Sequence, residues 1–184
     1  MLRPIETKSY KFSKLASAVG IEFFGDDFEV KGVVQSANEV KAGDLFVAIS
    51  GAKHHGAEFI NEAKANGAVA VITDITGSEM SKDLPTFIVG DPRKIVGELA
   101  AAFYNYPMRN MFTVGITGTN GKTTVTTLLH QIWQEAKWSS GLIGTINTQI
   151  DSEILPSLHT TPEASDLQAL MATMHERCVR TVAM

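Results

Sequence analysis

A glycine-rich segment between an apolar run and a helix-like run is the feature that most restricts how this chain can fold. Residues 111–117 read MFTVGIT, residues 118–124 read GTNGKTT, and residues 125–137 have the spacing of a helix. Glycines in such a turn let backbone N–H groups face an anion, and the helix N-terminus adds partial positive charge. The order of strand, glycine loop and helix therefore predicts a phosphate-binding loop in a doubly wound α/β sheet.

The side chains of this loop suggest ATP and Mg²⁺ as its ligands. We expect Lys122 to reach the β- and γ-phosphates and the Thr123 hydroxyl to bind the metal. The strict pattern G-x-x-x-x-G-K-[ST] is not met, because Ile116 stands where the first glycine belongs. A plain glycine-containing turn is the alternative. The candidate ATP-binding residues are Thr117, Gly118, Thr119, Asn120, Gly121, Lys122 and Thr123.

The segments before the loop alternate between strand-like and helix-like patterns, which favours parallel strand pairing. Asp91 followed by Pro92 is typical of a helix start. We expect a small amino-terminal α/β domain at 1–110, followed by an incomplete P-loop domain with a doubly wound parallel sheet at 111–184. The expected elements of the first domain are helices at 10–20, 57–66 and 91–104 and strands at 28–35, 44–50, 68–73 and 86–89.

In the second domain, the strand at 111–117 is expected to be central, and the helix after the loop to bury Leu128, Leu129, Ile132 and Trp133. A parallel α/β sheet rarely stops after so few strands, so we expect the chain to be a truncated part of a longer domain. Apolar faces of the helix at 124–137 and the strand at 179–184 would then lack partners. The expected consequence is self-association.

Composition excludes several classes of protein. The net charge of −4 argues against a nucleic-acid partner, which calls for clustered Lys and Arg. No apolar run approaches the roughly 20 residues of a membrane span, and the start lacks the apolar core of a signal peptide. We therefore expect no membrane partner and a cytoplasmic location. The single cysteine, Cys178, is predicted to be a buried, inert thiol.

The loop and its surroundings resemble the Mur ligases of peptidoglycan synthesis. The pattern G-x-T-G-T-N-G-K-T-T at 115–124 is similar to their phosphate loop, which departs from the strict pattern in the same way. Folylpolyglutamate synthetases have a similar loop, but typically with serine where this chain has Thr124. The stretches at 32–51 and 159–163 (HTTPE) are similar to the Mur ligases that add the third residue of the stem peptide. The resemblance covers nearly the whole chain.

The resemblance implies an ATP-dependent ligase with Mg²⁺ as cofactor. Such an enzyme phosphorylates the terminal carboxylate of UDP-N-acetylmuramoyl-L-alanyl-D-glutamate, and the amine of diaminopimelate or lysine then displaces the phosphate. The family's metal-binding glutamate, carbamylated lysine and amino-acid-binding domain would lie beyond Met184. The resemblance thus implies no complete catalytic set within this chain.

The resemblance also implies which residues hold the UDP-sugar. Ser36 would hydrogen-bond the nucleotide, although Gln35 and Ala37 depart from the family's aspartate and arginine. The implied UDP-sugar-binding residues are Val34, Ser36, Ala52, Lys53, His54, His159, Thr160 and Thr161.

Other interpretations stay open for some of these residues. Ser36 would also serve as a turn residue, and His54 and His55 as solvated loop histidines on opposite sides of the chain. Thr161 would also serve as the N-cap of the following helix, with Pro162 in its first position.

Two other functions stay open for the whole chain. One is a nucleotide-binding module without catalysis, and the other is a different P-loop ligase such as a folylpolyglutamate-synthetase-like enzyme. Binding of a uridine nucleotide by residues 1–110 separates the Mur ligase interpretation from the second of these.

Overall fold

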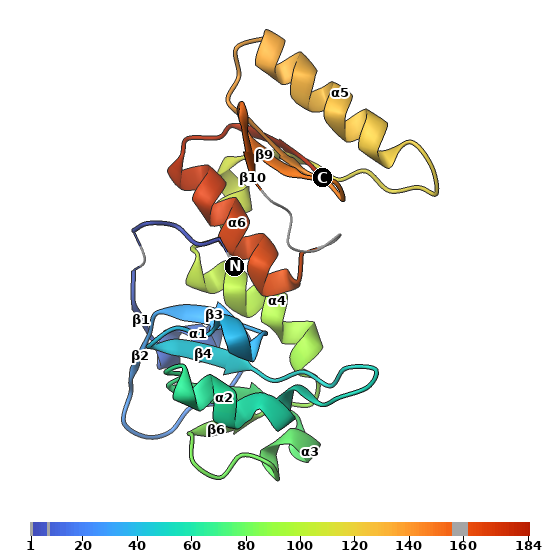
Figure 1. Cartoon of the computed structure of the whole chain (residues 1–184). Coiled ribbons are helices and arrows are strands. Elements are labelled where there is room, and N and C mark those ends of the chain that lie inside the picture. The colour runs from blue at the N-terminus through green and yellow to red at the C-terminus, as the bar shows by residue number, and fades with distance from the viewer. Residues whose placement is uncertain (1, 7, 156–161) are drawn as a thin grey trace.

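The structure, a computed structural model, describes residues 2–6, 8–155 and 162–184. It contains a four-stranded sheet, a five-stranded sheet and a two-stranded ribbon. Helices α4 (Pro92–Phe103) and α6 (Ala164–Glu176) lie between the two larger sheets, as Figure 1 shows. The predicted α/β fold with parallel sheets is confirmed.

The first sheet is wholly parallel and follows chain order, β3–β4–β5–β6. Its strands lack the polar face of a half-solvated sheet, because neighbouring residues such as Val33 and Val34 are both fully buried, on opposite faces. The sheet is therefore the middle layer of three. Its strands are β3 (Gly32–Val34), β4 (Asp44–Val47), β5 (Ala70–Thr73) and β6 (Thr86–Ile88).

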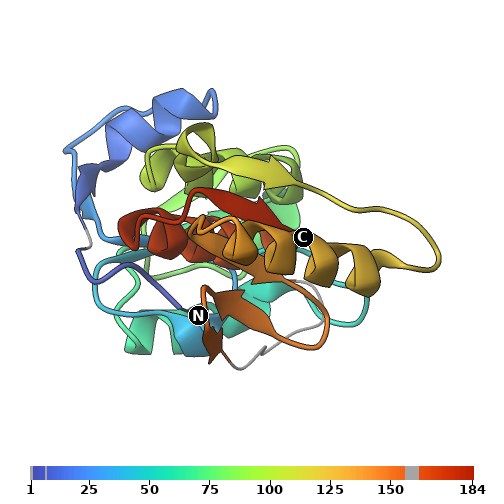
Figure 2. The same cartoon turned by 90° about the horizontal axis from the view of Figure 1, so that it is seen from above.

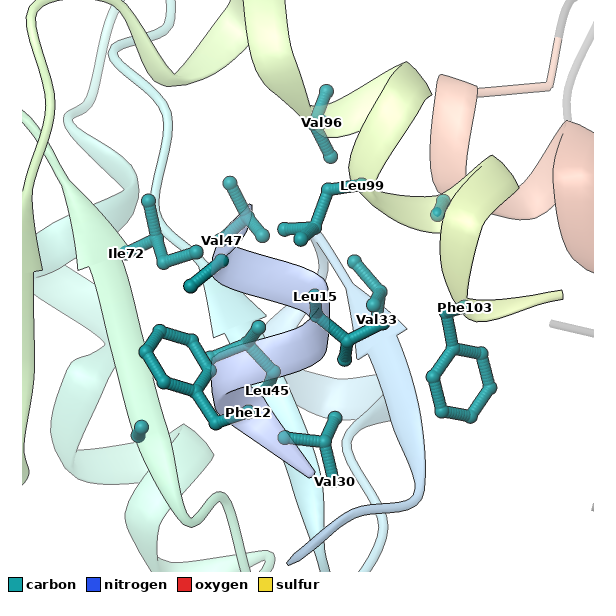
Figure 3. Packing of buried hydrophobic residues seen from close by; sticks show 13 residues of the cluster. Phe12, Leu15, Val30, Val33, Leu45, Val47, Ile72, Val96, Leu99 and Phe103 are labelled. Carbon is teal, nitrogen blue, oxygen red and sulfur yellow. The ribbon is translucent and has the colours of Figure 1, made fainter. Parts of the chain in front are cut away.

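Helices α1 (Phe12–Ala18) and α4 cover one face of this sheet, and Figure 3 shows their side chains meeting those of the strands. Phe12 is fully buried, and its ring stacks on Phe87 with 4.1 Å between centroids. Leu99 of α4 is also fully buried over the strands. The ribbon of β1 (Tyr10–Lys11) and β2 (Glu29–Val30) flanks α1.

Shorter helices cover the other face. They are η1 (Ala37–Glu39), η2 (Gly56–Phe59) and α2 (Ile60–Ala65), and α3 (Ile75–Ser78) follows β5. Ile60 of α2 and Phe46 of β4 meet in this second buried cluster. Apolar packing on both faces makes the sheet a rigid base for the loops at its edges.

The second sheet has the order β10–β9–β8–β11–β7, and the prediction that 111–117 forms its central strand is wrong. Strand β11 pairs in parallel with both β8 and β7, so β7 lies at an edge of the sheet. Helix α5 connects β7 to β8, which are not neighbours in the sheet. The position between them is occupied by β11, which comes later in the chain. The strands are β7 (Phe112–Val114), β8 (Ser140–Ile143), β9 (Thr148–Ile150), β10 (Glu153–Leu155) and β11 (Thr181–Ala183).

Helix α5 (Lys122–Glu135) packs on this sheet through a largely polar face. Its buried residues are Thr126, His130 and Trp133. His130 Nδ1 lies 3.0 Å from Ser140 Oγ, and His130 Nε2 donates to the carbonyl of Asp151 at 3.2 Å. Because these polar bonds select the inward face, the helix is rotated away from the predicted orientation.

The outcome for the four predicted core residues of α5 is mixed. Trp133 is buried as predicted, and Leu129 is half-buried. Leu128 and Ile132 are exposed, so their assignment to the core is wrong.

Helix α6 covers the opposite face of the second sheet with Leu170, Met171 and Met174. The short helix η3 (Pro107–Asn110) packs beside it. Strand β11 lies beneath α6, and Val182 is fully buried, so the predicted exposure of 179–184 is wrong. Cys178 occupies a left-handed turn before β11 and is exposed, which contradicts the prediction of a buried thiol.

The outer face of α5 is apolar and exposed, and we expect it to drive self-association. Leu128 and Ile132 expose 52% and 59% of their surface. Replacing Ile132 with lysine should shift the protein toward monomer in analytical ultracentrifugation. Ile75→Lys, at an equally exposed isoleucine on α3, is the matched control and should change nothing. A wild-type protein that stays monomeric at every concentration, or equal effects of both changes, would refute this expectation.

Candidate nucleotide-binding site

The glycine loop at 115–121 connects the end of β7 to the first residue of α5. Gly118 and Gly121 have φ values of 150° and 82°, a region that L side chains rarely adopt. Gly121 is the N-cap of α5, and no side chain caps the first N–H groups of the helix. These N–H groups lack partners inside the helix, so they are available to an anion.

A cleft of about 840 Å³ opens over this loop. Six of the seven predicted ATP-binding residues line it, and Gly118 is the exception. The opposite walls come from the ends of β8 and β11 and from the start of α6. The other lining residues are Gly115, Ile116, Thr124, Thr126, Ile143, Gly144, Thr145, Pro162, Leu167 and Met184. The cleft thus lies at the carboxyl ends of parallel strands, where open α/β sheets bind ligands.

Lys122 is a cation that lines this cleft, and its ammonium donates to the carbonyl of Gly118 across the loop. The contact holds the ammonium over the loop. An ammonium carries three N–H donors, so one bond to Gly118 leaves two for phosphate oxygens.

The residues of the cleft fit a magnesium ion in part. Thr123 lines the cleft at the start of α5 and offers a hard hydroxyl oxygen. The lining residues that the structure describes include no carboxylate. Within the described ranges, no group of three or more His, Cys, Asp or Glu side chains is placed to hold a metal. The role of Thr123 as a metal ligand stays a prediction.

The carboxyl-end edge of the first sheet carries the residues predicted to bind UDP-sugar. Ser36 follows β3, is exposed, and donates from Oγ to Asn38 Oδ1 at 2.6 Å. Ala52 and Lys53 are exposed in the loop after β4. Val34 is fully buried beneath this edge, so its side chain serves the core. Their roles toward a nucleotide stay predictions.

The loop at 50–56 is closed by its own backbone. Gly51 N donates to His54 O and Gly56 N donates to Ile49 O, both at 2.9 Å. A Cβ at Gly56 would lie 2.8 Å from Ile49 N, so glycine is required there. Arg93 at the start of α4 donates to Ser50 O at 3.0 Å. Its own hydrogen bonds and the bond from Arg93 therefore define the shape of the loop.

The two adjacent histidines of this loop differ in environment. His54 is exposed, with its Nδ1 3.0 Å from Glu58. His55 is nearly buried, accepts at Nδ1 from Ala57 N, and therefore donates from Nε2 to Asp74 at 3.0 Å. The interpretation of His55 as a solvated loop residue is wrong. It is instead a structural tie between the loop and the end of β5.

Hydrogen bonds to the carboxylates hold this tie together. A backbone bond from Gly77 and the side-chain bond from His55 lower the pKa of Asp74. A backbone bond from His55, followed by the side-chain bond from His54, lowers the pKa of Glu58. Sequence reasoning missed Asp74, although an aspartate at a strand end before a short helix is a recognisable N-cap signal.

Three predicted residues, His159, Thr160 and Thr161, lie outside the described residues. The start of the next helix is described, and its N-cap is Glu163. The interpretation of Thr161 as N-cap and Pro162 as first helical residue is therefore wrong. At this helix start, the side chain of Gln35, which follows β3, accepts from Ser165 N at 3.1 Å.

The loop at 50–56 and the glycine loop extend toward the same side of the molecule in Figures 1 and 2.

None of the helices in the described ranges is both long and apolar enough to cross a bilayer.

Family profiles match both parts of the chain. The profile described as Mur ligase family, catalytic domain, matches residues 29–104, and that of the Mur ligase middle domain matches residues 116–184. The chain belongs to the Mur ligase family. The UDP-N-acetylmuramoyl-L-alanyl-D-glutamate–2,6-diaminopimelate ligase of Streptomyces coelicolor is 43% identical over 99% of this chain. The chain spans 36% of the length of that relative.

Solved structures of Mur ligases share the fold. A UDP-N-acetylmuramoyl-L-alanyl-D-glutamate–2,6-diaminopimelate ligase structure has a TM-score of 0.76 and 22% identity, covering 97% of this chain and 35% of its own. The MurF ligase of Thermotoga maritima in complex with ADP has a TM-score of 0.52 and 25% identity, covering 82% of this chain and 31% of its own. The order of sheets and loops described above is thus that of the Mur ligases.

Proposed function

We propose that this protein acts in ATP-dependent amide-bond formation on UDP-N-acetylmuramoyl-L-alanyl-D-glutamate, with diaminopimelate as the incoming amino acid. Residues 1–110 bind the UDP-sugar and residues 111–184 bind the phosphates of ATP. The observation that carries the proposal is the glycine loop at the uncapped N-terminus of α5, facing a cleft at the carboxyl ends of parallel strands. The identity to the Streptomyces coelicolor ligase supports the choice of substrates.

In this proposal the loop residues bind and orient the triphosphate. The N–H groups at the start of α5 and the Lys122 ammonium neutralise its charge, and Thr123 is a ligand of Mg²⁺. When bound, the metal supplies further neutralisation of the phosphate oxygens. Ser36, Ala52, Lys53 and His54 hold the uridine diphosphate at the other sheet, on loops that the core keeps in place.

Ser36 offers a direct test of the nucleotide-sugar half of the proposal. Its hydroxyl hydrogen is given to Asn38, so the oxygen is oriented and can accept from a nucleotide donor. We expect wild-type protein to bind UDP in calorimetry and Ser36→Ala to bind it about two- to tenfold more weakly, the range of one neutral hydrogen bond.

Ser17→Ala, at an exposed serine of α1, is the matched control and should bind like wild type. No UDP binding by wild-type protein would remove the assignment of residues 1–110. Equal binding by wild type and Ser36→Ala would remove Ser36 from the site and leave the assignment of the domain in place.

A further inference from the structure

The contact between the two halves of the molecule is made largely by α4 and α6. Ala164, the first residue of α6, packs against the core of the first sheet. A Cβ placed on Gly97 of α4 would lie 3.7 Å from the Cβ of Ala164. Small side chains at this crossing let the two helices approach closely.

One side chain from the first sheet forms directional bonds to the start of α6. Gln35 directly follows β3, and its Oε1 accepts from Ser165 N at 3.1 Å. Its Nε2 donates to Glu163 Oε2 at 3.4 Å. The N–H of Ser165 belongs to the first turn of α6 and has no partner within the helix. The side chain of Glu163 does not cap the helix, so Gln35 supplies the cap from the other half of the molecule.

The position of Gln35 relates it to both proposed ligand sites. Its neighbour in the chain is Ser36, on the edge proposed to bind UDP. The helix that it caps begins between Pro162 and Leu167, both of which line the cleft over the glycine loop. We propose that Gln35 is a positioning residue that fixes this wall of the cleft to the segment carrying Ser36. Its coupling of the two ligands rests on the proposed function.

In the described part of the chain, three buried polar groups near the contact of α4 and α6 form no hydrogen bond that would hold the two halves together. Ser165 Oγ, Gln168 Oε1 and Tyr104 Oη are buried and have no hydrogen-bond partner among the described residues. The N–H groups of Ile5 and Glu6 hold Glu176 at the far end of α6, away from the cleft. The bonds of Gln35, by contrast, act at the N-terminal end of α6, beside the cleft.

Amide hydrogen exchange of Ser165 tests the positioning role without any ligand. Because Gln35 is the partner of this N–H, Gln35→Ala should speed its exchange about two- to tenfold. Val125 N, which donates to Gly121 O within α5, should keep its rate in the same sample. Gln131→Ala, at an exposed glutamine of α5, is the control and should leave Ser165 protected.

A double variant, Gln35→Glu with Glu163→Gln, exchanges the amide and the carboxylate. It keeps an acceptor for Ser165 N and a donor–acceptor pair between the two side chains, so protection should return. Unchanged exchange of Ser165 in Gln35→Ala, or no recovery in the double variant, would overturn the positioning role.

Calorimetry tests the consequence for the two ligands. In wild-type protein, saturation with UDP should change the Kd of Mg·ATP about fivefold or more, and Gln35→Ala should bring this factor toward one. Each ligand alone should still bind the variant. If wild type binds neither ligand, the proposed function fails while the exchange result still decides the positioning role. If wild type binds both and the factor survives in Gln35→Ala, the coupling role of Gln35 is wrong.

Discussion

Lys122→Ala should weaken the binding of Mg·ATP about ten- to hundredfold. The change removes the ammonium that lies over the glycine loop and lines the cleft. A hydrogen bond to a charged group contributes about 1.5–3 kcal/mol, which corresponds to that range of affinity. The backbone N–H groups of the loop and of the start of α5 stay in place, so some affinity for phosphate should persist.

The measurement is calorimetry with Mg·ATP on wild type and variant, beside Lys82→Ala as control. Lys82 is exposed between α3 and β6. Its replacement changes the net charge as much as Lys122→Ala does and leaves the glycine loop intact. Inorganic phosphate in place of ATP would show how much affinity the backbone alone provides. Equal affinity of wild type and Lys122→Ala would mean that Lys122 is not a phosphate ligand, and the proposed role of the loop would lose its main side chain.

The glycine loop could be predicted from sequence because its signals are local. Glycines at 118 and 121 allow the positive φ values, and the strand before and the helix after are each apparent within about ten residues. The first sheet was equally accessible, since Asp91 and Pro92 mark the start of α4 and the apolar runs mark the strands.

The incorrect predictions concern elements whose arrangement depends on residues distant in sequence. The inward face of α5 is selected by Ser140 and by the carbonyl of Asp151, and no periodicity within the helix reports them. The place of β7 at an edge depends on β11, which lies almost 70 residues further along the chain. The bond between Gln35 and the first turn of α6 likewise joins residues far apart in sequence, so no local pattern reports it.

Asp44→Ala should reduce the free energy of unfolding by about 3–5 kcal/mol, the cost of breaking a buried ion pair by removing one partner. Asp44 is fully buried and receives two bonds from the Arg3 guanidinium, at 2.9 and 2.6 Å. The backbone N–H of Lys41 donates to the same carboxylate at 2.8 Å. The carboxylate therefore secures the amino-terminal segment to the first sheet.

The ion pair of Arg3 and Asp44 lies against Gly32. A Cβ at Gly32 would lie 2.4 Å from Asp44 Oδ1 and 2.8 Å from Arg3 Nη1, so the pair fills a space that glycine leaves open. Removal of the carboxylate takes from Arg3, whose side chain is 8% exposed, the charge that lies against its guanidinium, and leaves the bond to the Glu39 carbonyl.

Urea-induced unfolding followed by circular dichroism measures the effect of Asp44→Ala, and an exposed ion pair provides the control. Lys64 and Asp83 lie 3.2 Å apart with 45% and 62% of their side chains exposed, so Asp83→Ala should cost less than about 1 kcal/mol. Because both variants replace an aspartate of an ion pair with alanine, the difference between their unfolding free energies reports the effect of burying the pair. Equal costs at the two positions would show that the buried pair gives the first sheet no special stability, and that the amino-terminal segment is held by its other contacts.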